Sequence, residues 1–258
     1  DYYDYLIAAN GMIPEKNHKY FSEKIVYLPT YQVNDSKETL PENLFTREDL
    51  GLPKDSFVFC CFNNTYKITP IVFDSWARIL NKVEKSVMMI YVSNKLAEKN
   101  LIKEIKLRGI DPARLVFGAK LTRNEYLDRY RSADLFLDTF PYNAGTTASD
   151  ALKMGLPILT LNGNSFNSKE AANIISAVNL SEMITTSQEE YESLAVELAN
   201  NPMKYRTIKD KLVDNLSDAP LYNTRLFAKN IESAYKTMFD RYHKGLDHDH
   251  IHVKNINS

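Results

Sequence analysis

The residues from Asp134 to Pro157 have the types and spacing of a phosphate-binding segment. A short apolar strand leads into a loop, and a helix then begins near Thr146 and ends at Gly155. The start of a helix presents backbone N–H groups that lack partners within the helix, and its dipole attracts anions. Thr147 adds a second hydroxyl there, and Asp150 lies one turn later, where its carboxylate could accept from a sugar hydroxyl. The pattern predicts a nucleotide diphosphate site, although a plain turn capped by Thr146 explains it equally well.

A lysine follows a second apolar strand. The run from Phe57 to Phe62 is apolar throughout, which is typical of a central parallel strand, and Asn64 and Lys67 come soon after it. Thr69 and Pro70 then mark the start of a helix. Ligands of doubly wound sheets bind beyond the carboxyl ends of the strands, so Lys67 is a phosphate candidate. A solvated loop lysine is the alternative.

An aromatic residue and two cations share the predicted helix from Arg123 to Arg131. Tyr126 could stack on a nucleobase, with Arg123 and Arg129 at the same mouth. On an amphipathic helix, a half-buried Tyr126 with both arginines in water is equally reasonable. The segment is therefore compatible with a nucleoside diphosphate site and equally with an ordinary surface helix.

Histidines are absent from the loops that follow the predicted strands. We therefore do not expect a histidine general base from this sheet. The tail from Asp247 to His252 alternates Asp and His and could bind a metal, but no strand precedes it, so we expect a flexible tail. Neither a glycine-rich nucleotide fingerprint nor a hydrolase nucleophile motif occurs. The five histidines are His18, His243, His248, His250 and His252.

Composition excludes several classes of partner. The formal net charge is −1, which argues against nucleic acid or an acidic membrane surface as a partner. Cys60 and Cys61 are adjacent in an apolar run, which suits neither an ordinary disulfide nor a metal site, so we expect two core residues of a cytoplasmic protein. No stretch reaches the roughly 18 apolar residues of a membrane span, and no leader is visible.

Strands and helices alternate through the middle of the chain. This alternation predicts an α/β fold, with a doubly wound parallel sheet and helices on both faces. The chain then becomes helical from Gln188 onward. The segments 5–7 and 24–29 are also expected strands, 31–42 an irregular linker and 46–52 one helical turn. The predicted series is strands 57–62, 87–92, 115–117, 134–137 and 158–161 with helices 70–83, 95–108, 123–131, 146–154, 168–178, 189–200, 203–216 and 223–243.

Three motifs together resemble a known family. The segments are FCCFNNTYKITP at 59–70, DLFLDT at 134–139 and TTASDAL at 146–152. They resemble the carboxyl-terminal catalytic half of the O-linked N-acetylglucosamine transferases, particularly the SPINDLY-type bacterial members. The resemblance runs from Asp4 to about Gly245, nearly the whole chain.

The resemblance implies the carboxyl-terminal Rossmann-like domain of a GT-B glycosyltransferase. It implies inverting transfer of N-acetylglucosamine from UDP-N-acetylglucosamine to a protein Ser or Thr, with no metal or other cofactor. An upstream catalytic half and tetratricopeptide repeats are the implied partners, besides the nucleotide sugar and the acceptor protein. The implied donor contacts are Lys67, also the catalytic candidate, and Asn64 on the diphosphate, Thr146 and Thr147 at the helix start, Asp150 on the ribose, Tyr126 at the uracil, and Arg123 and Arg129 as basic contacts.

Two positions depart from the family pattern, and they leave rival functions open. Gly145 stands where the family usually has a histidine that contacts the diphosphate or sugar, and Tyr126 replaces another histidine. One rival is a nucleotide-binding or scaffolding module without catalysis, and the other is a GT-B transferase with another donor such as GDP-fucose. The expected organisation is a connector at 1–45, the nucleotide-sugar domain at 46–222, a helix at 223–245 that packs toward the amino-terminal half, and a flexible tail at 246–258.

Overall fold

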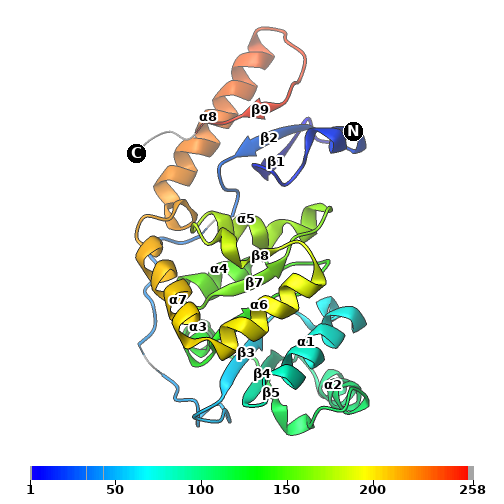
Figure 1. Ribbon diagram of the computed structural model, residues 1–258. Helices are drawn as coiled ribbons and strands as arrows, with labels where there is room; N and C mark the ends of the chain where they lie inside the picture. Colours follow the sequence, from blue (N-terminus) through cyan, green and yellow to red (C-terminus); the bar gives the residue numbers. More distant parts are fainter. Residues whose placement is uncertain (1, 33, 43, 255–258) are drawn as a thin grey trace.

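The computed structural model describes residues 2–32, 34–42 and 44–254. Six parallel strands form its main sheet in the order β5-β4-β3-β6-β7-β8 (Figure 1). The strands are β3 Phe57–Cys61, β4 Ser86–Tyr91, β5 Leu115–Gly118, β6 Leu135–Leu137, β7 Ile158–Leu161 and β8 Ile184–Thr185. The predicted α/β class is therefore confirmed.

Helices connect successive strands and then continue beyond the sheet. Thr69 accepts from the Val72 N–H at the start of α1, and Pro70 is its first residue, as the sequence indicates. The segment 46–52 forms turns, so the predicted helical turn there is wrong. The helices are α1 Pro70–Lys82, α2 Lys95–Leu107, α3 Arg123–Arg129, α4 Thr146–Lys153, α5 Glu170–Ser176, α6 Gln188–Asn200, α7 Pro202–Leu216 and α8 Thr224–His243.

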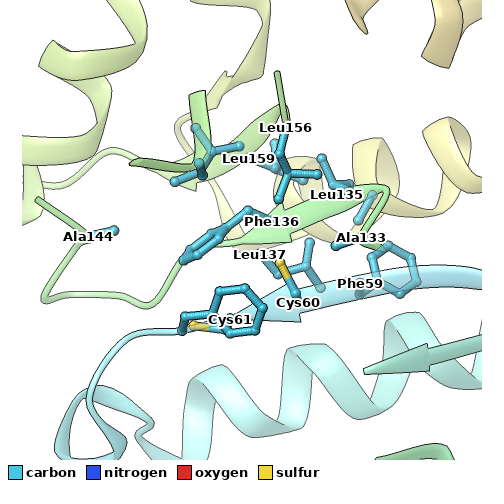
Figure 2. Packing of buried hydrophobic residues seen from close by; sticks show 14 of the residues in the cluster. Phe59, Cys60, Cys61, Ala133, Leu135, Phe136, Leu137, Ala144, Leu156 and Leu159 are labelled. Carbon is cyan, nitrogen blue, oxygen red and sulfur yellow. The ribbon is translucent and has the colours of Figure 1, made fainter. Parts of the chain in front are cut away.

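The centre of the main sheet is apolar on both faces. Phe59, Cys60 and Cys61 of β3 and Phe136 of β6 are all fully buried, and they pack beside each other (Figure 2). Both cysteines are free thiols in this core, as predicted. The strands can therefore hold the loops at their carboxyl ends in fixed positions.

The direction of winding reverses between β3 and β6. From β3 the chain adds β4 and then β5 on one side, and it returns to the other side of β3 with β6, β7 and β8. Two connecting segments therefore diverge above neighbouring strands, which leaves room for a ligand at their carboxyl ends. The loop that carries Lys67 and the start of α4 both lie at this point.

The two ends of the described chain build a second, smaller sheet. Strand β2 (Lys24–Leu28) pairs in parallel with β1 (Tyr5–Ala9) on one side and with β9 (Ile251–His252) on the other. The expected strands 5–7 and 24–29 are thus present inside the segment 1–45. The expectation of a flexible tail is wrong for β9, because its backbone pairs with β2. Residues 255–258 of the expected tail lie outside the described residues.

Helix α8 covers this small sheet. Ala234 of α8 packs with Val26 and Leu28 of β2 and with Ile251 of β9, all nearly or fully buried. Figure 1 shows α8 running alongside β2 and β9, away from the main sheet. Among the described helices, none combines the length and apolar character needed to cross a membrane.

Candidate functional site

Lys67 connects the two loops that diverge at the point where the winding reverses. It ends a short 3-10 turn, Thr65–Lys67, that follows β3. Its Nζ donates to the Asn143 carbonyl at 2.8 Å and lies 3.8 Å from the centre of the Tyr142 ring. Both partners belong to the loop between β6 and α4. The structure therefore brings Lys67 to the start of α4, as the parallel sheet predicts.

The first turn of α4 has free backbone donors. Gly145 is the N-cap residue and has no side chain to cap the helix. Within the described residues, the N–H groups of Thr146 and Thr147 have no hydrogen-bond acceptor. Thr146 is exposed and Thr147 half-buried. Unpartnered N–H groups beside an ammonium group are suited to an anion such as a phosphate.

A buried polar network holds this helix start in place. The Thr147 hydroxyl donates to Oδ1 of Asn63, and Nδ2 of Asn63 donates to Asp138 Oδ1 at 3.1 Å and to Thr139 Oγ1 at 2.8 Å. Asn63 lies two residues after β3 and Asp138 directly follows β6, and they are 2% and 0% exposed. We did not select either residue from the sequence. A polar residue directly after an apolar strand was the available signal.

Asp138 is the centre of this network. Its Oδ1 accepts from the N–H groups of Thr139 and Ala144, both at 2.8 Å, and its Oδ2 accepts from Thr160 Oγ1 at 2.7 Å. Burial raises the pKa of Asp138 to about 7, while these donors act in the opposite direction. One carboxyl group thus fixes the loop before α4 from several sides.

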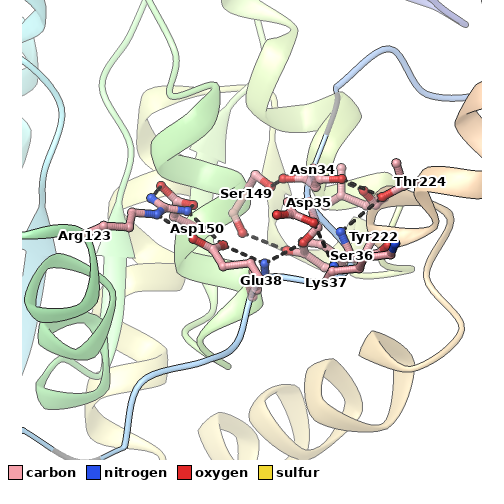
Figure 3. A network of polar contacts seen from close by, with 12 residues as sticks. Asn34, Asp35, Ser36, Lys37, Glu38, Arg123, Ser149, Asp150, Tyr222 and Thr224 are labelled. Atoms are coloured by element: carbon pink, nitrogen blue, oxygen red, sulfur yellow. Dashed lines mark hydrogen bonds and ion pairs between the residues drawn. The ribbon is translucent and has the colours of Figure 1, made fainter.

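Asp150 is already ion-paired. Both its oxygens accept from Arg123, at 2.9 and 2.8 Å, and Arg123 also contacts Glu38 at 2.7 Å (Figure 3). Glu38 pairs in addition with Lys153 at 2.7 Å. The hydrogen bonds from Arg123 and Lys153 lower the pKa of Glu38 to about 2 despite some desolvation, and the Asp150 contact raises the pKa of Arg123. A sugar hydroxyl would have to share or replace these contacts to reach Asp150.

The linker that carries Glu38 is fixed to α4 and α8. The Ser149 hydroxyl donates to Oδ1 of Asn34, and Thr224 Oγ1 donates to the Asn34 carbonyl at 2.8 Å. Tyr222 OH donates to the Ser149 carbonyl at 2.7 Å. Figure 3 shows these residues on one side of the Arg123–Asp150 pair. The irregular linker expected at 31–42 therefore forms one wall of the Asp150 region.

Tyr126 and Arg129 form an aromatic and cationic stack. The Tyr126 hydroxyl bonds to that of Tyr130, and burial raises the pKa of Tyr126. Arg129 is only 1% exposed, with its Cζ 5.4 Å from the Tyr126 ring and 3.9 Å from the Phe62 ring. Arg123 is exposed, so the two arginines do not share one open mouth. Arg129 would support the Tyr126 ring from below.

A depression lies next to this stack, beyond the carboxyl ends of β4 and β5. Its volume is about 530 Å³, and Arg129 adjoins it through the hydrogen bond from its Nη1 to the Ala119 carbonyl at 3.1 Å. The residues lining the depression include Tyr91, Ser93, Lys95, Phe117, Ala119 and Lys120.

Asn64 does not line this depression. It is exposed at the start of the 3-10 turn, where its side chain makes no capping hydrogen bond.

A wider depression lies elsewhere. It has a volume of about 720 Å³ and lies at the amino ends of β3, β4 and β6, beside Arg47 and Lys85. The guanidinium of Arg47 is committed to Asp134 at 2.7 Å and to the Ser56 carbonyl at 2.8 Å. Within the described residues, no group of three or more His, Cys, Asp or Glu side chains could hold a metal ion. The site at the carboxyl ends is thus the better candidate for chemistry.

Comparison with known families decides the family of the chain. The model of glycosyl transferase family 41 matches residues 32–231. The chain belongs to glycosyl transferase family 41. The resemblance expected from the three sequence motifs is confirmed, and so is the assignment to a family of glycosyltransferases.

Relatives of this family 41 chain agree. It is 32% identical, over 98% of its length, to the "Probable UDP-N-acetylglucosamine--peptide N-acetylglucosaminyltransferase SEC" of Arabidopsis thaliana and covers 26% of that protein. It is also 32% identical to the "UDP-N-acetylglucosamine--peptide N-acetylglucosaminyltransferase" of Caenorhabditis elegans, over 83% of this chain and 19% of the relative. The chain therefore spans about a quarter or less of these relatives.

Solved structures support the fold of this family 41 chain. A mutant O-GlcNAc transferase of Thermobaculum terrenum superposes with a TM-score of 0.78 at 24% identity, over 92% of this chain and 45% of that one. A sucrose-phosphate synthase of Thermosynechococcus elongatus superposes with a TM-score of 0.65 at 14% identity, over 92% of this chain and 59% of that one. The predicted GT-B type of fold is confirmed.

Proposed function

We propose that this chain is the nucleotide-sugar-binding part of a protein O-glycosyltransferase. The observation that carries the proposal is that the N–H groups of Thr146 and Thr147 have no acceptor among the described residues and lie next to Lys67, where the winding of the sheet reverses. The proposed donor is UDP-N-acetylglucosamine, as the names of the relatives suggest. The proposed acceptor is a Ser or Thr hydroxyl of another protein. The free buried Cys60 and Cys61 support a reducing, cytoplasmic location.

The reaction that we propose is an inverting displacement without a metal. The acceptor oxygen forms a bond to the anomeric carbon, and the bond from that carbon to the diphosphate oxygen breaks. Lys67 and the first N–H groups of α4 would stabilise the negative charge on the departing diphosphate. The proton of the acceptor would pass to a base on an upstream catalytic half, because no histidine lies on the described strand-end loops of the main sheet.

Calorimetric titration of UDP, GDP and UDP-N-acetylglucosamine tests the donor site. Lys67→Ala should weaken nucleotide binding about 100-fold, because it removes a charge-assisted contact to the diphosphate. Lys103→Ala, an exposed lysine on α2, is the matched control and should bind like the wild type. Absence of binding to any nucleotide, or equal binding by Lys67→Ala and Lys103→Ala, would contradict the proposal.

The same titrations separate the rival functions. Tighter binding of GDP than of UDP would support another donor, such as GDP-fucose. Nucleotide binding without sugar transfer to peptide, when the upstream half is supplied, would support a binding module that lacks catalysis.

A further inference from the structure

Glu170 occupies the space beside the start of α4. It is the first residue of α5 and is half-buried, and its Oε1 accepts from the Tyr31 hydroxyl at 2.8 Å. A Cβ built on Gly145 would lie 2.3 Å from this Oε1 and 2.8 Å from the Glu170 Cδ. A side chain at position 145 would therefore have to displace the Glu170 carboxylate from its present position.

The carboxylate lies beside the N–H groups of α4 without using them. Within the described residues, no hydrogen bond joins Glu170 to the N–H of Thr146 or Thr147. The positive end of the helix dipole favours a carboxylate nearby. The ammonium group of the neighbouring Lys169 donates to the Gly11 carbonyl at 3.2 Å rather than to this carboxylate. A negative charge thus stands next to free donors that would receive a phosphate.

The direction of the bound nucleotide follows from the proposed function, on which this inference rests. The base would lie near Tyr126, the ribose near Asp150 and the phosphates at Thr146 and Thr147. The group joined to the last phosphate therefore extends past the start of α4, toward Gly145 and Glu170. That group is the sugar in the donor and a free phosphate oxygen in the nucleoside diphosphate.

We propose that Glu170 is a specificity-determining residue that makes this site favour a nucleotide sugar over the free nucleoside diphosphate. A terminal phosphate gains an additional negative charge near neutral pH, and the Glu170 carboxylate would repel it. A neutral sugar carries no such charge, and its hydroxyls can donate to the same carboxylate. Both effects act in the same direction. Glu170 would therefore retain the donor and help to release the diphosphate after transfer.

The test is the ratio of two dissociation constants, that of the nucleoside diphosphate divided by that of its nucleotide sugar. It is measured by calorimetry for UDP with UDP-N-acetylglucosamine and for GDP with GDP-fucose. Glu170→Gln should lower the ratio about tenfold for the pair that binds, mainly through tighter binding of the diphosphate. Glu232→Gln, the same change of charge at an exposed site on α8, should leave the ratio unchanged.

A second variant keeps the inference testable if Glu170→Gln folds poorly. Tyr31→Phe removes the hydroxyl that orients Glu170 and should lower the same ratio by a smaller factor. A ratio within twofold of the wild type in both variants would overturn the inference. If UDP binding still depends on Lys67 in that case, the proposed function stands and only the role of Glu170 fails. If no nucleotide binds the wild type, both proposals fail.

Discussion

At the start of α4, the N–H groups of Thr146 and Thr147 have no acceptor in the described part of the chain, whereas one turn later both oxygens of Asp150 already accept from Arg123. The proposed phosphate end of the site therefore has free donors for an anion, whereas the proposed ribose end is closed by an internal ion pair. A bound nucleotide would gain hydrogen bonds from the N–H groups at the first end without breaking any. At the second end, the ribose would have to replace Arg123 as the partner of Asp150.

The rigidity of the phosphate end depends most on Asp138. Asp138→Asn keeps one acceptor oxygen for the N–H groups of Thr139 and Ala144, but it puts an NH2 group, with one hydrogen more than the protonated carboxyl, at the buried position of Oδ2 beside the Thr160 hydroxyl. We therefore expect a loss of about 2 kcal/mol in the free energy of unfolding near pH 5. Denaturant titration measures this loss. Asp55→Asn, at an exposed position in a turn before β3, serves as the control. A loss below about 0.5 kcal/mol would show that the network does not hold the loop.

The penalty of Asp138→Asn should also depend on pH. The folded-state pKa of about 7 is above the ordinary value of 3.8, so the stability that Asp138 contributes is complete below about pH 4 and is lost as the pH rises through 7. Asparagine does not titrate, so the difference between variant and wild type should narrow from pH 5 to pH 8. A difference that widens instead would show that the donors outweigh burial and keep Asp138 ionised.

The ribose end is tested by Asp150→Asn. If the ribose replaces Arg123 on this carboxylate, the variant should bind UDP about tenfold more weakly, because an amide is a poorer acceptor for two hydroxyls. Asp74→Asn is the control, since Asp74 also pairs with an arginine, Arg108 at 2.6 Å, but on α1. Unchanged affinity in Asp150→Asn would mean that the ion pair with Arg123 persists in the complex.

Thr147 connects the phosphate site to the buried network. Thr147→Val removes the hydroxyl that donates to Asn63 and leaves Oδ1 of that amide without its donor. We expect about fivefold weaker nucleotide binding and a loss of about 1 kcal/mol of stability. Thr207→Val is the control, because its hydroxyl donates to a backbone carbonyl on the exposed face of α7. Equal effects of the two variants on nucleotide binding would show that Thr147 does not act at the proposed phosphate end.

The smallest effect is expected from Glu38→Gln. Glu38 contacts Arg123 and Lys153 at the surface, so the variant should lose at most about 1 kcal/mol of stability. The pKa of Glu38 is lowered from 4.5 to about 2, so its contribution is present above about pH 4.5 and disappears as the pH falls toward 2. Comparison of wild type and variant across this range should show the gap closing. A stability difference that does not change with pH would show that Glu38 acts through packing and not through its charge.

Much of the main sheet was predictable because its signals are local. The apolar run 57–62, the Thr69–Pro70 helix start and the strand Ile158–Leu161 were read directly from residue types, and the structure has them within a few residues. Strand β8 was missed because it has two residues, too few for a pattern. The pairing of β9 with β2 was also missed, since no local pattern reveals a partner so far away in sequence.

In the candidate site, too, the features with a local sequence signal were predicted, and those that depend on distant contacts were not. Lys67 and the start of α4 were found because residues that follow parallel strands meet at one edge. Glu38 and Tyr31 come from a segment without regular structure, and only the folded chain brings them to Arg123 and Glu170. The burial of Arg129 beneath Tyr126 depends on packing, which the amphipathic pattern of α3 leaves undecided.

The small sheet cannot be completed until the end of the described chain has been synthesised. The backbone N–H of Ile25 in β2 donates to His250, next to β9, across 225 positions of sequence. All the residues of the main sheet leave the ribosome before β9 does, so that sheet can fold while one edge of β2 is still unpaired. Contacts between such distant positions form slowly. Until β9 arrives, this edge of β2 is open to pairing with other chains, and the pairing with β9 covers it.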